Sequence, residues 1–510
     1  MNTDEKIVSV DKLLSEIGHY PRKKTVVMCH GTFDIVHPGH IRHLRYAKSK
    51  ADILIASLTS DEFINKGTYK PYVPEALRAS NLASLHLVDY VIVDGSAKPL
   101  DNIEIIKPDY FAKGYEYQSG PLNSRTQEEI AVLDRYGGNI LYTPGDVVYS
   151  STSLMEQEQP QLKYEKLISL MESEGISFQQ IKQSLLGLGG QHVHIIGDTI
   201  VDRQTQCAPY GSGNKTPTLS VRFESKADFV GGAAIVALHL KAAGSDVVFS
   251  TVLGEDAPGS FVKKELERAG ISVQSIEEPG RPTTLKNAVI VQGYRLLKID
   301  SVENKPITEK VSQFICSSIK SNPADVVIFS DFKHGIFTKN NIEYFRDNIP
   351  SGAFKAADSQ VATRWGNILD FRGFDLITPN EKEARFSLGD QDSVIRPLAK
   401  KLYEKANCET LILKCGERGV ITYLKKDDDY RAFFSMDSFA EKIVDPVGAG
   451  DALLAYSSLV LSKYNSPIIA AIIGNIAAGI ECEFDGNIPI EVPMLIERIN
   501  QIEKHCNYEF

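Results

Sequence analysis

The chain has 510 residues, 43% of them hydrophobic and 24% charged, and its formal net charge is −10. A chain of this length exceeds one ordinary hydrophobic core, so we expect two or three domains. The acidic balance argues against a nucleic-acid binder that depends on a basic surface, and we expect no nucleic-acid partner.

The seven cysteines are scattered and contain no C-x-x-C pair. This pattern indicates a reducing compartment without a zinc site or a disulfide framework. The N-terminal segment is acidic and does not resemble a secretory signal, and no run approaches the roughly 18 apolar residues of a membrane span. We therefore expect a cytoplasmic protein with no membrane partner.

Short apolar runs alternate with amphipathic segments over residues 1–155. The runs at 25–29, 51–58, 89–95 and 109–114 predict buried parallel strands, and the segments between them predict helices. This βαβ alternation is typical of an α/β domain. The polar, helix-forming segment 156–190 then predicts a helical linker.

A second α/β pattern starts at His192, and we expect one large domain over residues 191–510. Two stretches with the two-residue alternation of strands, 216–232 and 282–300, interrupt this pattern. They predict a small inserted sheet.

The segment "HGTFDIVHPGH" (30–40) follows the first apolar run and precedes a predicted helix. Ligands of open α/β sheets bind beyond the carboxyl ends of the strands, and a helix N-terminus favours phosphate. His37 and His40, beside Gly39, could donate hydrogen bonds to a phosphoryl group. A lone histidine would more often be a surface or capping residue, but H-x-G-H after G-x-F-D is far harder to obtain by chance.

This segment resembles the signature of the cytidylyltransferase-like nucleotidyltransferase superfamily, and the resemblance extends from Thr25 to Thr152 through "IKPDYFAKGYEY" and "YSSTSLM". It implies a Rossmann-like domain in which His37 and His40 act on the triphosphate. The further residues it implies for nucleotide and phosphate binding are Gly31, Phe33, Lys48, Arg78, Lys113, Ser151 and Thr152. Lys48 could equally be a surface lysine of its helix.

The reaction implied is attack of a sugar-phosphate oxygen on the α-phosphorus of a nucleoside triphosphate, with Mg²⁺ bridging the phosphates. Cytidylyltransferases of this superfamily usually carry an R-T-x-G-I-S-T segment. This chain has "YTPGDVVYSST" instead, which lacks the arginine. The nucleotide therefore stays open between ATP and CTP.

The segment "VDPVGAGDALLAY" (444–456) is the strongest signal in the second half. The backbone N–H groups of Gly448, Ala449 and Gly450 at a helix start can form an anion hole, and Asp451 could accept a proton from an attacking hydroxyl. An N-capping aspartate is the simpler alternative, but capping alone does not require G-A-G-D.

Together with "TPNEKEA", "LKCGERG", "GDTIVD" and "VGGAAIV", this segment resembles the ribokinase-like (PfkB) carbohydrate kinases from residue 192 to about 500. The resemblance implies a three-layer αβα domain with a small β lid, Asp451 as catalytic base and ATP with Mg²⁺ as cofactors. It also implies Asn380 and Glu383 at the magnesium. Gly416 falls on the nucleotide side, and the residues implied for the sugar side are Asp198, Asp202, Gly231 and Gly232.

A sugar kinase and a sugar-phosphate nucleotidyltransferase on one chain resemble the bifunctional heptose-7-phosphate kinase/heptose-1-phosphate adenylyltransferases, with the usual domain order reversed. We expect an enzyme that makes an NDP-activated, heptose-like sugar for a bacterial surface glycan, acts on small sugar phosphates and nucleoside triphosphates, and forms a homodimer. Ile235 and "SDFKHG" (330–335) depart from the family pattern near the sugar. Two alternatives remain: a kinase with a cytidylyltransferase for another sugar or polyol, or one half that is degenerate and regulatory.

Overall fold

The computed structural model describes residues 3–64, 70–114, 124–143, 163–212, 219–360, 367–424 and 433–506. The chain divides into two compact units, Met1–Leu170 and Met171–Phe510. Across the described ranges, no helix is both long enough and apolar enough to cross a bilayer.

The described part of the first unit contains a parallel sheet in the order β3-β2-β1-β4-β5. Its strands are β1 (Val26–Gly31), β2 (Ile53–Thr59), β3 (Tyr90–Asp94), β4 (Tyr110–Gly114) and β5 (Asn139–Thr143). Its helices are α1 (Val10–Ile17), α2 (Pro38–Lys48), α3 (Glu75–Ala83), α4 (Leu100–Ile106) and α5 (Ser124–Asp134). The strand order reverses beside β1, as in a Rossmann-like domain.

The central strand β1 is buried on both faces, which explains its continuous apolar sequence. Val27 and Cys29 pack into a core with residues of α2 and α3. Val26 and Met28 point the other way, into a core with residues of α1, α4 and α5. Because helices cover both faces, the polar segment that follows β1 can emerge only at the carboxyl edge of the sheet.

The described part of the second unit has a sheet in the order β10-β9-β6-β13-β14-β15-β16-β17-β18, parallel from β10 to β16 and antiparallel beyond. The parallel strands are β6 (His192–Gly197), β9 (Asp246–Leu253), β10 (Ser272–Glu277), β13 (Val326–Asp331), β14 (Phe354–Ser359), β15 (Leu376–Ile377) and β16 (Thr410–Lys414). The last two strands are β17 (Val420–Leu424) and β18 (Phe433–Met436).

Helices flank this sheet as the two outer layers of a three-layer fold. One layer contains α9 (Ala233–Ala242), α15 (Ala449–Tyr464) and α16 (Pro467–Glu481), with α8 (Phe178–Leu186) and α17 (Val492–Cys506) packed against it. The remaining helices are α10 (Ala257–Arg268), α11 (Glu309–Ser321), α12 (Lys339–Arg346), α13 (Glu381–Leu388) and α14 (Ile395–Ala406). The segment predicted as a linker contributes α7 (Lys163–Ser173) and α8, and α8 packs into the second unit.

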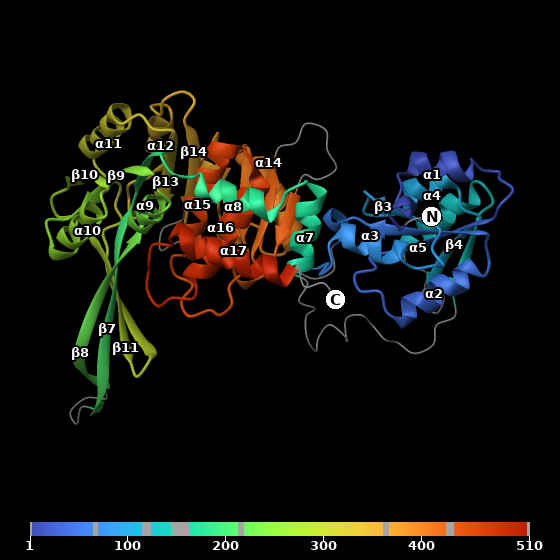
Figure 1. Cartoon of the computed structure of the whole chain (residues 1–510), viewed down its shortest axis with the longest axis horizontal. Coiled ribbons are helices and arrows are strands. Elements are labelled where there is room, and N and C mark those ends of the chain that lie inside the picture. Colours follow the sequence, from blue (N-terminus) through green and yellow to red (C-terminus); the bar gives the residue numbers. More distant parts are fainter. Residues whose placement is uncertain are drawn as a thin grey trace. The chain divides into compact units, whose positions relative to one another are not determined.

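The predicted inserted strands form a separate sheet, called the lid below. Its order is β12-β11-β7-β8, and the strands are β7 (Thr199–Ser212), β8 (Leu219–Gly232), β11 (Thr284–Val291) and β12 (Tyr294–Ser301). Figure 1 shows β7, β8 and β11 extending away from the body of the second unit. Gly232 ends β8 with a φ of 63°, and α9 starts at the next residue, so the lid joins the body through this turn.

Candidate functional site

The first candidate site is built where β1 runs into α2. His37 is the N-cap of α2, and its Nδ1 accepts a hydrogen bond of 3.1 Å from the Gly39 amide. The rings of His37 and His40 lie 3.9 Å apart between centroids, tilted by 31°, and Phe33 packs edge-on against His40 at 5.2 Å. The structure therefore brings both histidines to the N-terminus of α2, at the carboxyl edge of the sheet.

Small residues make room for this arrangement. A Cβ on Gly39 would lie 2.8 Å from the His37 ring, and one on Gly31 would lie 3.2 Å from the Phe33 ring. Burial lowers the pKa of His37, and the nearby Arg42 adds to the effect. A neutral imidazole at the helix terminus can hydrogen-bond to a phosphate through one ring nitrogen while the other caps the helix.

Arg78 lies in the same region but is fully buried and bonded to the protein itself. Its guanidinium donates to the carbonyls of Val73 and Thr59 at 2.9 and 3.0 Å and to the carbonyl of Thr32, and it pairs with Asp61 at 2.6 Å. These contacts tie together the segments that follow β1 and β2. In this geometry Arg78 holds the walls of the site in place.

Lys113 lies near the carboxyl end of β4, on the same edge as the histidines. Its Nζ donates to Thr126 Oγ1 at 3.0 Å and forms an ion pair with Glu129, and both partners are on α5. Thr126 and Glu129 were not predicted at this site from the sequence, because a polar or acidic residue on an amphipathic helix does not by itself indicate a function. Ser151 and Thr152 lie outside the described residues.

Lys48 is not brought to this site. It is the last residue of α2, its Nζ donates to the Asp52 carbonyl at 2.6 Å, and it pairs with Asp89 at 2.5 Å. The same Asp89 carboxylate accepts from the amide of Leu54, near the start of β2. Lys48 therefore lies at the amino edge of the strands, opposite to His37 and His40.

The second candidate site is built at the N-terminus of α15. Gly448 has a φ of 89°, and a Cβ there would lie 2.8 Å from both Asn487 Oδ1 and Glu481 Oε1. Only glycine combines this backbone with so close an approach. The turn places Ala449 and Gly450 as the first residues of α15, where backbone N–H groups lack partners within the helix. The structure thus places these residues at a helix N-terminus, where the sequence predicts an anion hole.

Asp451 lies in the first turn of α15, next to a buried charged cluster. Lys414 Nζ, at the end of β16, is 3.0 Å from each carboxylate oxygen of Asp358, and Thr378 also donates to Asp358. Burial raises the pKa of Asp451 well above its ordinary value, with Asp358 adding to the rise and Lys414 opposing it. A carboxylate with a raised pKa is a stronger base, as proton abstraction from a hydroxyl requires.

Asn380 and Glu383 form a reciprocal capping box at the start of α13. The Asn380 backbone amide donates to Glu383 Oε2 at 2.7 Å, and the Glu383 backbone amide donates to Asn380 Oδ1 at 2.9 Å. Glu383 also influences the pKa of Lys414, so the box lies beside the charged cluster. In the described ranges, no three His, Cys, Asp or Glu side chains form a metal site. Asn380 and Glu383 carry oxygen atoms, which are the ligands that Mg²⁺ prefers in proteins.

The predicted sugar-side acids have different environments. Asp198 is buried and accepts from the backbone amides of Phe332 and His334 at 2.9 and 3.2 Å, so it holds the 332–336 loop in place. Asp202, on the lid strand β7, accepts from Asn487 Nδ2 at 3.0 Å. Burial raises the pKa of both carboxyls. Asp202 is thus the acid that faces the anion-hole region.

Glycines pack the backbone tightly at the lid hinge. A Cβ on Gly231 would lie 2.2 Å from Asp202 Oδ2, and one on Gly232 would lie 2.5 Å from the Asp198 carbonyl. Gly416 has a φ of 61° in the turn after β16, with open space around it. The first two positions are therefore closely packed at the base of the lid, and Gly416 lies just beyond the strand that carries Lys414.

Three other charged residues lie at the second site without having been predicted there. Arg295, on the lid strand β12, pairs with Asp445 at 2.5 Å, and Asp445 also accepts from the Val447 amide in the turn before Gly448. Burial raises the pKa of Glu481 to about 8. Asp445 could have been suspected from its place in "VDPVGAGD", whereas Arg295 and Glu481 depend on tertiary contacts.

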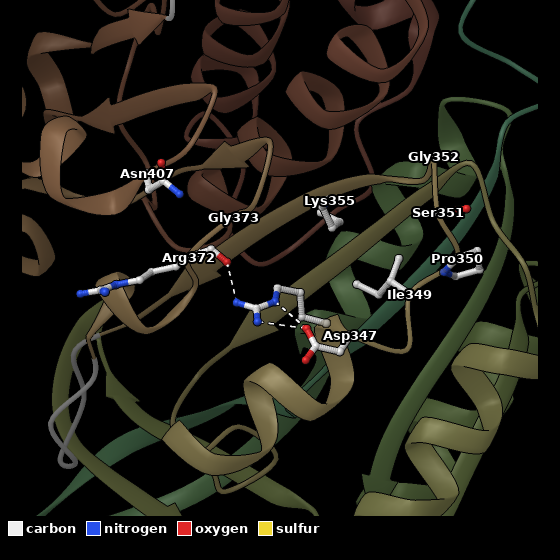
Figure 2. Close-up of a pocket in the computed structure, with 10 residues that line it drawn as sticks. Asp347, Ile349, Pro350, Ser351, Gly352, Lys355, Arg372, Gly373 and Asn407 are labelled. Atoms are coloured by element: carbon white, nitrogen blue, oxygen red, sulfur yellow. Dashed lines mark hydrogen bonds and ion pairs between the residues drawn. The ribbon is translucent and has the colours of Figure 1, made fainter.

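A hollow of about 420 Å³ lies away from the second site, at the amino edge of the nine-stranded sheet beside the start of β14. Arg346, one of the residues that line it, donates to the carbonyl of Arg372 at 3.1 Å and pairs with Asp347 at 3.0 Å. Figure 2 shows Asp347 and Arg372 in this lining. None of the residues predicted for catalysis or binding lines this hollow.

The pfkB family carbohydrate kinase profile matches residues 191–489 of the chain. The chain belongs to the pfkB family of carbohydrate kinases. A cytidylyltransferase-like profile matches residues 28–157, ahead of the kinase region. The two matched ranges contain the two sites described above.

Curated relatives include bifunctional proteins named HldE. The HldE of a Nitratiruptor species is 25% identical over 293 residues, which is 56% of this chain and 60% of its own length. That of Desulfatibacillum aliphaticivorans is 28% identical over 295 residues, which is 56% of this chain and 59% of its own length. That of Helicobacter pylori (strain Shi470) is 43% identical over 117 residues, 22% of this chain and 25% of its own. The chain thus spans about 60% of the length of the first relatives it matches.

Among solved structures, phosphofructokinase-2 from Escherichia coli in complex with fructose-6-phosphate aligns with a TM-score of 0.51 at 14% identity. The alignment covers 61% of this chain and 99% of that one. At this identity the likeness shows the fold, a ribokinase-like domain that occupies most of the second unit.

Proposed function

We propose that the chain is a bifunctional enzyme that phosphorylates a heptose-like sugar phosphate with ATP and transfers a nucleotidyl group to a sugar 1-phosphate. The observation that carries this proposal is that two turns each lead into a helix N-terminus, at α2 with His37 and His40 and at α15 with Asp451. Relatives named bifunctional, with matches to both kinds of domain, support it. The product is an NDP-activated sugar for bacterial surface glycan synthesis.

In the kinase half, the amides of Gly448, Ala449 and Gly450 stabilise the transferring phosphoryl group, and Asp451 removes the proton from the attacking hydroxyl. Lys414 keeps the negative charges around Asp451 partly compensated. Such a reaction needs positioning and charge stabilisation more than covalent chemistry. ATP is the phosphoryl donor, and Mg²⁺, when bound, neutralises phosphate charge beside Asn380 and Glu383.

In the nucleotidyltransferase half, His37 and His40 hold the triphosphate at the N-terminus of α2. Lys113, which pairs with Glu129, lies on the same edge of the sheet as a further hydrogen-bond donor from β4. The sugar 1-phosphate oxygen attacks the α-phosphorus and pyrophosphate leaves. We favour ATP over CTP as the nucleotide, because the arginine of the cytidylyltransferase R-T-x-G-I-S-T segment is missing from "YTPGDVVYSST". A cytoplasmic location supplies both ATP and the reducing conditions under which the seven cysteines stay free.

We also propose that two copies pair through the outer face of the lid. The strand register places Phe223, Tyr294, Leu297 and Ile299 on the face opposite to Asp202. These side chains are 60%, 71%, 55% and 53% exposed. An apolar patch on an extended sheet favours association, because monomeric proteins rarely expose one. Leu297→Glu should convert a dimer to a monomer in sedimentation velocity, and an unchanged sedimentation coefficient would refute this interface.

The activity test combines two screens of the intact enzyme. One measures ATP-dependent phosphorylation of sugars and sugar phosphates, including sedoheptulose 7-phosphate. The other measures pyrophosphate release while ATP, CTP, GTP and UTP are crossed with sugar 1-phosphates. We expect phosphorylation of a phosphorylated sugar in the first screen and release with ATP in the second. Absence of both activities would refute the proposal, and loss of one would favour a regulatory half.

A further inference from the structure

The hairpin formed by β11 and β12 reaches the turn that precedes α15. This hairpin reverses direction at Gln292 and Gly293, which have φ of 51° and 81°. Arg295, just past the reversal, places a guanidinium nitrogen 2.5 Å from Asp445 Oδ2. The lid therefore contacts the segment that leads into Gly448 and the start of α15.

Asp445 is the residue that holds this turn together. Its Oδ1 accepts a hydrogen bond of 3.2 Å from the Val447 amide, while its Oδ2 contacts Arg295. The amides of Val444 and Asp445 both donate to the Cys482 carbonyl, at 2.8 and 3.2 Å. Because α15 starts directly after this turn, the conformation of the turn sets where the first N–H groups of the helix point.

The negative charge of Asp445 is buried and lies near two other acids. Burial raises the pKa of Asp202 and of Glu481, and Asp445 adds to both rises. Within the described residues, Arg295 is the only cation found in an ion pair with Asp445. Without this arginine, an uncompensated carboxylate would lie beside the helix terminus at which the proposed phosphoryl transfer takes place, and it would repel the phosphoryl group.

A second arginine fixes the base of the same hairpin. Arg281, ahead of β11, donates to the carbonyls of Glu303 and Lys305, just beyond β12, at 3.0 and 2.6 Å. The same guanidinium donates to the His334 carbonyl at 2.8 Å, in the loop that Asp198 holds. Both ends of the hairpin are thus tied to the body of the second unit, so its far end presents a guanidinium from a fixed base.

We propose that Arg295 is a positioning residue for phosphoryl transfer, which neutralises Asp445 and holds the turn that leads into the predicted anion hole. This inference rests on the proposed kinase function and adds a role of the lid in the transfer step. Arg295 touches neither reactant in this role, because it acts through Asp445. Since the ion pair joins a lid strand to the turn, the anion hole is complete only while the hairpin rests on the body.

The test compares Arg295→Met, Asp445→Asn and the double variant with Arg222→Met as the matched control. Methionine removes the charge of arginine but remains a long side chain, and asparagine keeps an oxygen acceptor for the turn. Arg222 is an exposed arginine of the same lid and pairs with Glu224. We measure kcat and KM by ADP release with ATP and sedoheptulose 7-phosphate. Amide hydrogen exchange of the segment 441–456, measured by mass spectrometry on the intact protein, reports on the turn without requiring activity.

We expect kcat of Arg295→Met to fall about tenfold, with KM for the sugar and for ATP within about twofold of the wild type, since coupling between neighbouring groups corresponds to about 2- to 150-fold in rate. The double variant should be less impaired than Arg295→Met, because it also removes the carboxylate that the arginine neutralises. Exchange in 441–456 should be faster in Arg295→Met and unchanged in Arg222→Met.

A raised KM for the sugar at unchanged kcat, or equal losses of kcat in Arg295→Met and Arg222→Met, would overturn the inference while the kinase function stands. A double variant whose loss equals the product of the two single losses would also overturn it, because the two residues would then act independently. Absence of phosphorylation by the wild type would instead count against the kinase function, and faster exchange confined to Arg295→Met would in that case still support the contact between the lid and the turn.

Discussion

Replacement of Asp451 by asparagine separates a catalytic role from a structural one. The side chain keeps its shape, and no hydrogen bond to the Asp451 carboxylate is found in the described part of the chain, so the change breaks no such contact. A general base contributes about 10²- to 10⁴-fold to the rate, which is about 3–5 kcal/mol of barrier. We therefore expect kcat of the kinase to fall at least 100-fold in Asp451→Asn, with nucleotidyl transfer unchanged.

The same substitution should not destabilise the protein. Burial and the neighbouring Asp358 and Glu481 raise the pKa of Asp451, and only Lys414 among its main influences lowers it. A raised pKa in the folded state means that the ionised carboxylate opposes folding at neutral pH, by about 1.4 kcal/mol for each pH unit of elevation. Asparagine removes this cost, so Tm at pH 7 should stay equal or rise.

The pH dependence gives an independent check. In the wild type, kinase kcat should rise with pH as Asp451 loses its proton, through a pKa above the ordinary carboxyl range. The contribution of Asp451 to the free energy of unfolding changes with pH in the opposite direction to kcat. It becomes more favourable as pH falls through the raised pKa of the folded state, and it levels off below the carboxyl pKa of the unfolded state. Full kinase activity in Asp451→Asn, or a marked fall in its Tm, would contradict the reasoning.

Two further substitutions test the anion sites. Gly448→Ala forces a Cβ to 2.8 Å from two oxygens at a φ of 89°. We therefore expect Tm to fall and kinase activity to drop more than tenfold, while nucleotidyl transfer persists. The control Gly352→Ala, at a φ of 90° with open space around it, has the backbone strain without the close contact, so equal effects of the two substitutions on kinase activity would refute a specific role for Gly448. His40→Ala should reduce pyrophosphate release about 100-fold while kinase activity survives; wild-type release in this variant would remove His40 from the site.

The locally encoded parts of both sites could be predicted from the sequence. These parts depend on contacts between residues only a few positions apart in the chain. They are the positive φ of a glycine, the histidine that caps the helix it precedes, and the capping box at Asn380 and Glu383. The apolar runs likewise predicted the parallel strands, because a strand buried on both faces requires a continuous apolar sequence. For this reason His37, His40, Gly448 and Asp451 are found where the motifs indicate.

Tertiary structure decided what surrounds these motifs. Lys48, Arg78 and Asp198 all occur in motif-like segments. Lys48 nevertheless lies at the opposite end of its helix from the histidine site. Arg78 is hydrogen-bonded within the walls of that site, and Asp198 accepts hydrogen bonds from a backbone loop. Lys414 and Asp358 meet because β14, β15 and β16 are neighbours in the sheet. Arg295 likewise reaches Asp445 from the lid strand β12. Sequence spacing fixes short-range geometry, but the order of strands sets which distant charges share a site.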